Sequence, residues 1–178
     1  MNATVSPLNP VIRLICPSDS IAELTLLLRR AYKVLADMGF NYTATYQDEA
    51  TTVRRIEGGE CYVMADGAAL IAPFIGTITL YRKSKDSACL EPWYARPEVA
   101  SCAQFAVEPR LQRQGLGTKL MEFVEHRASE LGATEPALDT SEGAKYLVRF
   151  YMGRGYRVVD TVRWEGKTYR SVILSKGL

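Results

Sequence analysis

The sequence predicts a mixed α/β domain, with a mostly antiparallel sheet of about seven strands and helices on both faces. Amphipathic helical stretches alternate with short apolar strands, and turn residues separate most of the strands. The segment at residues 99–107 is apolar on both alternating faces, as expected of a central strand that is covered on each side. The 178 residues fit one domain spanning residues 1–178.

The first half is predicted to contain a strand, two helices and a hairpin. These elements are expected at residues 11–16 (strand), 20–38 (helix), 48–57 (helix), and 61–65 and 68–82 (strands). Ser20 stands three residues before Glu23, which is the spacing of a capping box at a helix start, and Gly39 ends that helix. Pro73 and Gly76 predict a bulge or an edge position in the second hairpin strand.

The second half is predicted to alternate strands and helices around a long polar loop. The elements are expected at residues 99–107 (strand), 114–131 (helix), 136–139 (strand), 143–154 (helix), and 156–164 and 169–174 (a final hairpin). The loop at residues 83–97 is longer than a hairpin needs, and loops of that length are often functional.

Composition excludes several classes of protein. With 22 Lys and Arg against 20 Asp and Glu, the net charge of +2 is too small for a non-specific nucleic-acid binder. The four cysteines are widely spaced, which argues against a zinc site and a disulfide framework. No signal peptide or membrane-spanning run is recognised. We therefore expect a cytoplasmic protein without nucleic-acid, membrane or metal partners.

The segment at residues 107–118 predicts an anion site, because it leads from a buried strand directly into a helix. The first N–H groups of a helix lack partners, and their dipoles attract phosphate. Gly115 and Gly117 let an anion approach these amides closely. Leu120 stands where a dinucleotide fingerprint needs a third glycine, and the order Gly117-Thr118-Lys119 does not match a P-loop.

The segment resembles a signature of the GNAT superfamily of acetyl-CoA-dependent N-acetyltransferases. The family's Val-x-Pro and Gln/Arg-x-x-Gly-x-Gly/Ala are matched by residues 107–109 and 112–117. A second family motif is matched by Phe150-Tyr151-Met152-Gly153-Arg154-Gly155-Tyr156, and an apolar-apolar-Gly strand by Phe74-Ile75-Gly76. The order of elements follows the family over nearly the whole chain.

The resemblance implies that the strand ending at residue 107 splays from the next strand, at residues 136–139, with acetyl-CoA as cosubstrate in the opening. It assigns the cofactor contacts to Phe105, Ala106, Val107, Gln112, Arg113, Gln114, Gly115, Leu116, Gly117 and Thr118. Many family members place Asn seven residues before the motif tyrosine, whereas this chain has Ala144 there.

The implied reaction is attack of a primary amine on the thioester within a ternary complex. Tyr151 is expected to protonate the leaving thiolate, although its spacing also fits a core aromatic, and the main-chain N–H near Val107 to stabilise the oxyanion. The family's usual glutamate is replaced by Ser101. Glu98 is therefore the general-base candidate, with Asp48, Glu49 and Glu165 as alternatives.

The acceptor is left open between a small molecule and a protein N-terminus. By analogy with the family, Phe40, Tyr42, Tyr46 and Trp93 are expected to line its pocket. The alternative to an enzyme is a non-catalytic acyl-CoA sensor or scaffold, and a nucleic-acid binder using Arg110, Arg113 and Lys119 is the weakest hypothesis. Pairing of the last strands in a homodimer is also left open.

Overall fold

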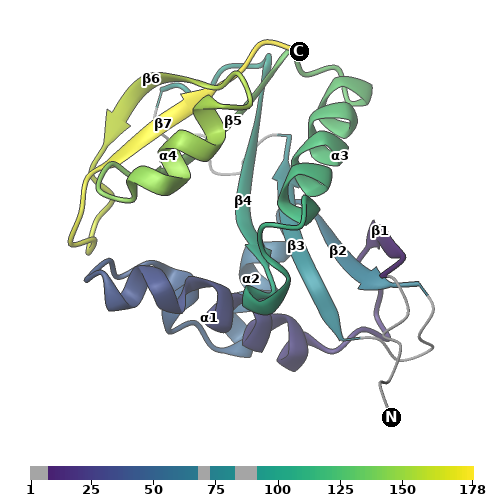
Figure 1. The fold of residues 1–178 in the computed structure, drawn as a ribbon. Helices are drawn as coiled ribbons and strands as arrows, with labels where there is room; N and C mark the ends of the chain where they lie inside the picture. Colours follow the sequence, from purple (N-terminus) through teal and green to yellow (C-terminus); the bar gives the residue numbers. More distant parts are fainter. Residues whose placement is uncertain (1–7, 68–72, 83–91) are drawn as a thin grey trace.

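The computed structural model describes residues 8–67, 73–82 and 92–178, which form a seven-stranded sheet with helices on both faces (Figure 1). The strands run in the order β1-β2-β3-β4-β5-β7-β6. They are β1 (Pro10–Leu14), β2 (Glu60–Asp66), β3 (Phe74–Tyr81), β4 (Val99–Val107), β5 (Glu135–Ser141), β6 (Arg157–Val162) and β7 (Ser171–Ser175), and the α-helices are α1 (Ile21–Asp37), α2 (Glu49–Ile56), α3 (Leu116–Glu130) and α4 (Lys145–Met152).

Two central strands, β4 and β5, run parallel and then separate. They pair only from Val99 to Ser101 on β4, although β4 continues to Val107. Figure 1 shows β4 diverging from the part of the sheet that holds β5, β7 and β6. All other neighbouring strands are antiparallel. The predicted fold class is therefore confirmed, including the splayed central pair.

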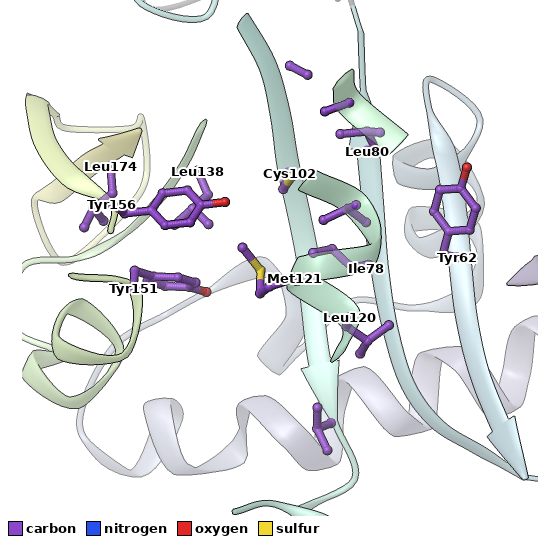
Figure 2. Close-up of a cluster of buried hydrophobic side chains, with 14 of the residues drawn as sticks. Tyr62, Ile78, Leu80, Cys102, Leu120, Met121, Leu138, Tyr151, Tyr156 and Leu174 are labelled. Carbon is purple, nitrogen blue, oxygen red and sulfur yellow. The ribbon is translucent and has the colours of Figure 1, made fainter. Parts of the chain in front are cut away.

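The alternation of side chains along the strands distributes the core between two faces. Cys61 and Val63 on β2 belong to a cluster with α1, whereas Tyr62 and Met64 belong to a cluster with α3. This second cluster also contains Tyr151 of α4 (Figure 2). Helices therefore cover both faces of the sheet. The packing of Tyr151 in the second cluster places α4 beside the diverging strands.

The predicted elements are present, with differences at their ends. The helix expected from residue 114 begins at Leu116, because Gly115 takes a left-handed conformation and becomes the N-cap. A register shift opposite Gly76 confirms a bulge in the β2–β3 pair, and the edge alternative is wrong because β3 lies between β2 and β4. Residues 68–72 of the expected hairpin lie outside the described residues.

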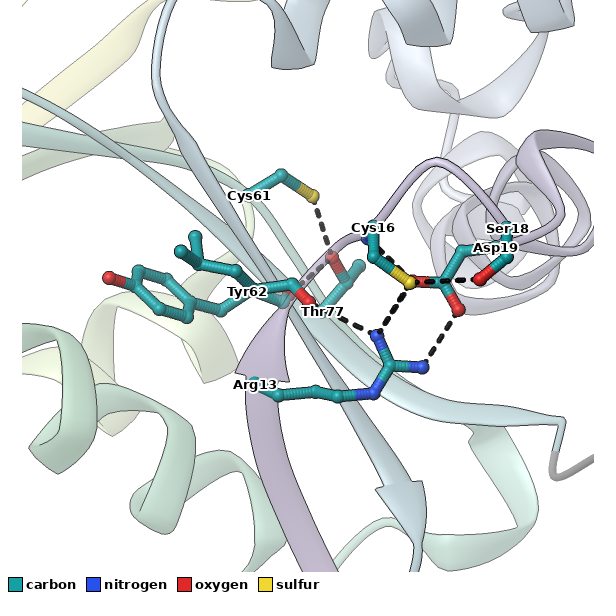
Figure 3. A network of polar contacts seen from close by, with 8 residues as sticks. Arg13, Cys16, Ser18, Asp19, Cys61, Tyr62 and Thr77 are labelled. Carbon is teal, nitrogen blue, oxygen red and sulfur yellow. Dashed lines mark hydrogen bonds and ion pairs between the residues drawn. The ribbon is translucent and has the colours of Figure 1, made fainter. Parts of the chain in front are cut away.

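The connection between β1 and α1 is held by an ion pair (Figure 3). The Arg13 guanidinium donates two hydrogen bonds to the Asp19 carboxylate, at 2.6 and 2.7 Å, and the backbone N–H of Cys16 donates a third at 2.7 Å. The hydrogen bond from Arg13 is the main reason why the pKa of Asp19 falls to about 2. The folded state thus favours the charged carboxylate.

We predict that Asp19→Asn lowers the free energy of unfolding by about 1 kcal/mol at pH 7, a value reduced by the exposure of Arg13. The pKa of Asp19 is lower in the folded chain than in the unfolded one, so its contribution is present above pH about 4 and is lost as the pH falls towards about 2. Urea unfolding of both proteins across this range measures the difference.

Asp37→Asn is the matched control, because Asp37 forms an exposed ion pair with Lys33 one helical turn away. Such pairs contribute roughly 0.5 kcal/mol or less. A stability difference for Asp19→Asn that is the same at pH 7 and at low pH would contradict the assignment.

Candidate active site

The turn between β4 and α3 presents backbone N–H groups that no other described residue binds. Beyond Val107, the chain makes a 3-10 turn at Pro109–Leu111 and enters α3 through Gly115. Gly115 has a φ of 80° and makes no side-chain cap. Within the described residues, no hydrogen bond is made by the N–H groups of Gly117 and Thr118. The helix entrance can therefore bind an anion.

Glycine is needed at the two positions of this turn for different structural reasons. Gly115 needs its left-handed conformation, and a Cβ there would point into open space. At Gly117, a Cβ would lie 3.1 Å from Cζ of Phe105, whose ring stacks on that of Phe150. Gly115 therefore shapes the turn, whereas Gly117 allows α3 to start close to β4 and α4.

The backbone of Val107 faces the space that β5 leaves. Val107 lies opposite Gly76, and the adjacent hydrogen bond, from the N–H of Glu108 to the carbonyl of Ile75, marks this as a pair that is not itself hydrogen-bonded. The N–H and carbonyl of Val107 consequently point away from β3. The carbonyl accepts a hydrogen bond from Nε2 of Gln112 at 3.2 Å. The N–H is directed to the side where β4 and β5 have separated.

A cleft of about 1390 Å³ runs along this side of β4 between α1, α3 and α4. Most residues that the sequence assigns to the cofactor line it: Phe105, Ala106, Val107, Gln112, Arg113, Gly115, Gly117 and Thr118. Gln114 does not line it, and the Leu116 side chain is buried in the core. The buried Ala144 stands where an asparagine was expected, so its methyl group offers no hydrogen bond.

A second, inner cavity of about 340 Å³ opens beside the cleft. Five residues line both cavities and define their junction: Tyr32, Tyr42, Phe105, Asp139 and Tyr151. A molecule in the cleft and one in the inner cavity can therefore meet only where these side chains gather.

Tyr151 belongs to the core and also lines both cavities. Its ring packs against Phe105, Phe150 and Tyr156 in the core (Figure 2). Its hydroxyl has no hydrogen-bond partner among the residues that the structure describes. Burial is the main cause that raises the pKa of Tyr151 well above its usual value, and the charge of Asp139 adds to the effect. The phenol therefore stays protonated at neutral pH.

The structure does not bring Glu98 to this junction. Glu98 precedes β4 at the end opposite to Val107, where its carboxylate accepts hydrogen bonds from Arg96 at 2.6 and 2.8 Å. It lines neither cavity, and the same is true of Asp48, Glu49 and Glu165. Asp48 instead caps α2 by accepting from the N–H of Thr51.

Asp139 is the carboxylate at the junction, and sequence reasoning missed it. It lies on β5 and accepts hydrogen bonds from Nε1 of Trp164 at 2.9 Å and from the Tyr94 hydroxyl at 3.3 Å. Its only sequence signal was its place at the predicted end of the strand that diverges from β4. Within the described parts of the chain, no Lys or Arg forms an ion pair with it.

Of the four residues predicted to line the acceptor pocket, only Tyr42 lines either of the two cavities. Phe40 packs against Tyr169, Tyr46 is 60% exposed, and Trp93 lies under the guanidinium of Arg96. The inner cavity is lined instead by residues that include Tyr32, Arg55, Trp164, Lys167 and Tyr169.

Comparisons with known proteins agree with this geometry. Residues 24–156 match the acetyltransferase (GNAT) family. The chain is 30% identical over 166 residues, or 90% of each chain, to an S-(2-succino)cysteine N-acetyltransferase of Bacillus subtilis. The chain therefore belongs to the GNAT family and is an N-acetyltransferase, which confirms the resemblance seen in the sequence.

Solved structures share the fold at low sequence identity. A GNAT acetyltransferase from Elizabethkingia anophelis with acetyl-CoA bound is 20% identical, with a TM-score of 0.64 over 96% of this chain and 99% of that one. A Bacillus subtilis acetyltransferase in complex with CoA is 19% identical, with a TM-score of 0.66 over the same shares.

Over residues 8–67, 73–82 and 92–178, no helix is both long and apolar enough to cross a membrane. The same ranges hold no group of three or more His, Cys, Asp or Glu side chains placed to bind a metal ion.

Proposed function

We propose that this enzyme transfers the acetyl group of acetyl-CoA to the primary amine of a small molecule, by direct attack in a ternary complex. The observation that carries the proposal is the junction of the two cavities. The cleft of about 1390 Å³ accommodates a long donor, and the inner cavity of about 340 Å³ suits a small acceptor. The reacting atoms would meet beside Tyr151 and Asp139.

The donor is proposed to lie along β4, with its pyrophosphate at the entrance of α3. The free N–H groups at Gly117 and Thr118 and the helix dipole favour an anion there. Beyond Ser101, β4 has no partner in β5, so its outward backbone groups are available to the amides of the pantetheine arm. This arrangement brings the thioester to the N–H of Val107.

The nitrogen of an ammonium acceptor must lose two protons, and the sulfur must gain one. A C–N bond forms as the neutral amine attacks the thioester carbonyl, and the C–S bond breaks as the thiolate leaves. Asp139 is proposed to receive the first proton of the ammonium, directly or through water, and the Val107 N–H to stabilise the oxyanion. Tyr151 gives its proton to the sulfur, and the second proton, lost from the nitrogen after the attack, restores the Tyr151 hydroxyl through water. Each group lies at, or points into, the space beside the junction.

A small acceptor is preferred to a protein N-terminus for two reasons. The inner cavity is narrow and has aromatic walls that include Tyr42, Trp164 and Tyr169. In addition, the name of the Bacillus subtilis relative specifies a small amino-acid derivative as its acceptor.

The first expected outcome is release of free thiol from acetyl-CoA that depends on an added amine. CoA at 100 times its dissociation constant should stabilise the folded protein by about 2.7 kcal/mol. A panel of small amines, with a peptide bearing a free N-terminus as one arm, should then show turnover with the small amines.

Turnover with the peptide alone would favour the protein acceptor. Stabilisation by CoA without turnover on any amine would favour an acyl-CoA sensor, and a complete lack of stabilisation would refute the proposed donor site.

The second expected outcome concerns Tyr151→Phe, which removes the hydroxyl and keeps the ring in the core. We expect kcat to fall by about 10²-fold with unchanged CoA affinity, because the leaving thiolate loses its proton donor. Steady-state kinetics and a CoA titration measure both quantities. Tyr62→Phe is the matched control, since that hydroxyl donates to Glu60 and lines neither cavity. A loss below about threefold for Tyr151→Phe would make Tyr151 a core residue only.

The third expected outcome concerns Asp139→Asn. Without a proton acceptor, only amine that is already neutral reacts, so kcat/KM should fall by about 10²-fold at pH 7. The variant's kcat/KM should then rise about tenfold per pH unit towards the pKa of the free amine, near 10 for an alkyl amine. Wild type should show a smaller rise.

Glu98→Gln provides the comparison for Asp139→Asn, because the hypothesis drawn from the sequence predicts the loss in that variant instead. Normal turnover of Asp139→Asn, or a decrease by the same factor at every pH, would show that Asp139 does not receive the proton.

A further inference from the structure

Two cationic side chains face the inner cavity without a counterion. Arg55 comes from α2 and Lys167 from the connection between β6 and β7, and both are half-buried. In the described residues, neither of them forms an ion pair with a carboxylate. Their partners are neutral oxygens: Arg55 donates to Oε1 of Gln47 at 2.7 Å, and Lys167 donates to the carbonyl of Asn41 at 3.0 Å, to Oγ1 of Thr43 at 2.9 Å and to the Tyr46 hydroxyl at 3.5 Å.

Comparable cations elsewhere in the chain do form ion pairs with carboxylates. Arg127, Arg154 and Lys176 are also partly buried, and each forms an ion pair with Glu60 or Glu125 at 2.7 to 3.3 Å. Removing a cation from water without an anion is unfavourable. The neutral partners hold Arg55 and Lys167 in place but do not neutralise them, so two cations and one carboxylate, Asp139, line the inner cavity.

The charge of Arg55 affects the tyrosines that line the cavity. Burial raises the pKa of Tyr32 and of Tyr169, and the positive charge of Arg55 opposes the rise in both cases. The aromatic walls displace water, so an anion placed between them interacts with the cations more strongly than it would in solvent. Arg55 uses one of its five donors in the bond to Gln47, which leaves others for a ligand.

The charges are also ordered along the cavity. Asp139 lines both cavities and therefore lies at the junction, whereas Arg55 and Lys167 line only the inner one. An acceptor with a cationic amine at one end and an anionic group at the other end matches this order. A guanidinium and an ammonium bind oxyanions, of which a carboxylate is one.

On the basis of the proposed function, we propose that the acceptor is an amino acid or a closely related molecule, whose primary amine lies at the junction and whose carboxylate binds Arg55 and Lys167. These two residues determine specificity and do not take part in the chemical step. A neutral or cationic amine of the same size would leave both cations unpaired, and this cost selects against it.

The test compares each L-amino acid of a panel with its own carboxamide, which keeps the amine and removes the negative charge. Wild type should prefer the acid over the carboxamide by about 100-fold in kcat/KM. Arg55→Gln should lower kcat/KM for the acid by a similar factor, mainly through KM, and should leave the carboxamide within about threefold. Lys167→Gln should act in the same direction.

Arg54→Gln is the matched control, because Arg54 neighbours Arg55 on α2, donates to the Thr51 hydroxyl and lines neither cavity. CoA affinity and thermal stability, measured for each variant, identify a folding defect. If Arg55→Gln does not fold, Lys167→Gln tests the carboxylate site by itself, because Lys167 lies on a separate element.

The outcomes separate this inference from the proposed function. Equal turnover of acids and carboxamides by wild type, or equal losses on both in Arg55→Gln and Lys167→Gln, would overturn the carboxylate site while leaving acetyl transfer intact. A lack of turnover on every amine would overturn the proposed function itself. A charge preference that disappears in the two variants, with the carboxamide rate retained, supports the site.

Discussion

The separation of β4 from β5 after Ser101 is the constraint on which the site depends. Adjacent strands normally satisfy each other's backbone groups, so a strand pair that parts inside a sheet leaves unpaired groups at its centre. Here the departure coincides with a bulge in β4, where Gln104 has a φ of 53° and the register with β3 shifts. The Gln104 side chain is buried and is held between Gln47 and Thr79. This buried polar contact fixes the bulge and thereby the direction in which Val107 points.

The same separation supports the role proposed for Tyr151. Because α4 packs across the diverging strands, the ring of Tyr151 completes the core while its hydroxyl reaches the space between β4 and β5. Close packing restricts the ring to one position, so little reorganisation is needed to donate a proton. Burial also raises the pKa of the phenol, so the proton is still present at alkaline pH.

The sequence predicted those features that depend on local pattern. Ser20 and Gly39 marked the ends of α1, and the glycines at residues 115 and 117 marked the turn into α3, because caps and left-handed residues involve only near neighbours. Most residues assigned to the donor line the cleft, and they could be named together because they lie in one continuous segment. The lining of the inner cavity could not be predicted in this way, because Arg55, Asp139 and Lys167 come together from three elements distant in the chain.

Glu98 illustrates the physical limit of that reasoning. A carboxylate next to the central strand resembles a candidate base, but a strand of nine residues spans about 30 Å, so its two ends cannot serve one reaction. Glu98 lies at the paired end of β4, whereas both cavities are lined by the unpaired part of β4 beyond Ser101. Asp139 reaches that end because β5 runs parallel to β4 and continues past the last shared pair. In this fold, a carboxylate on the diverging partner strand is better placed to serve the junction than one at the start of β4.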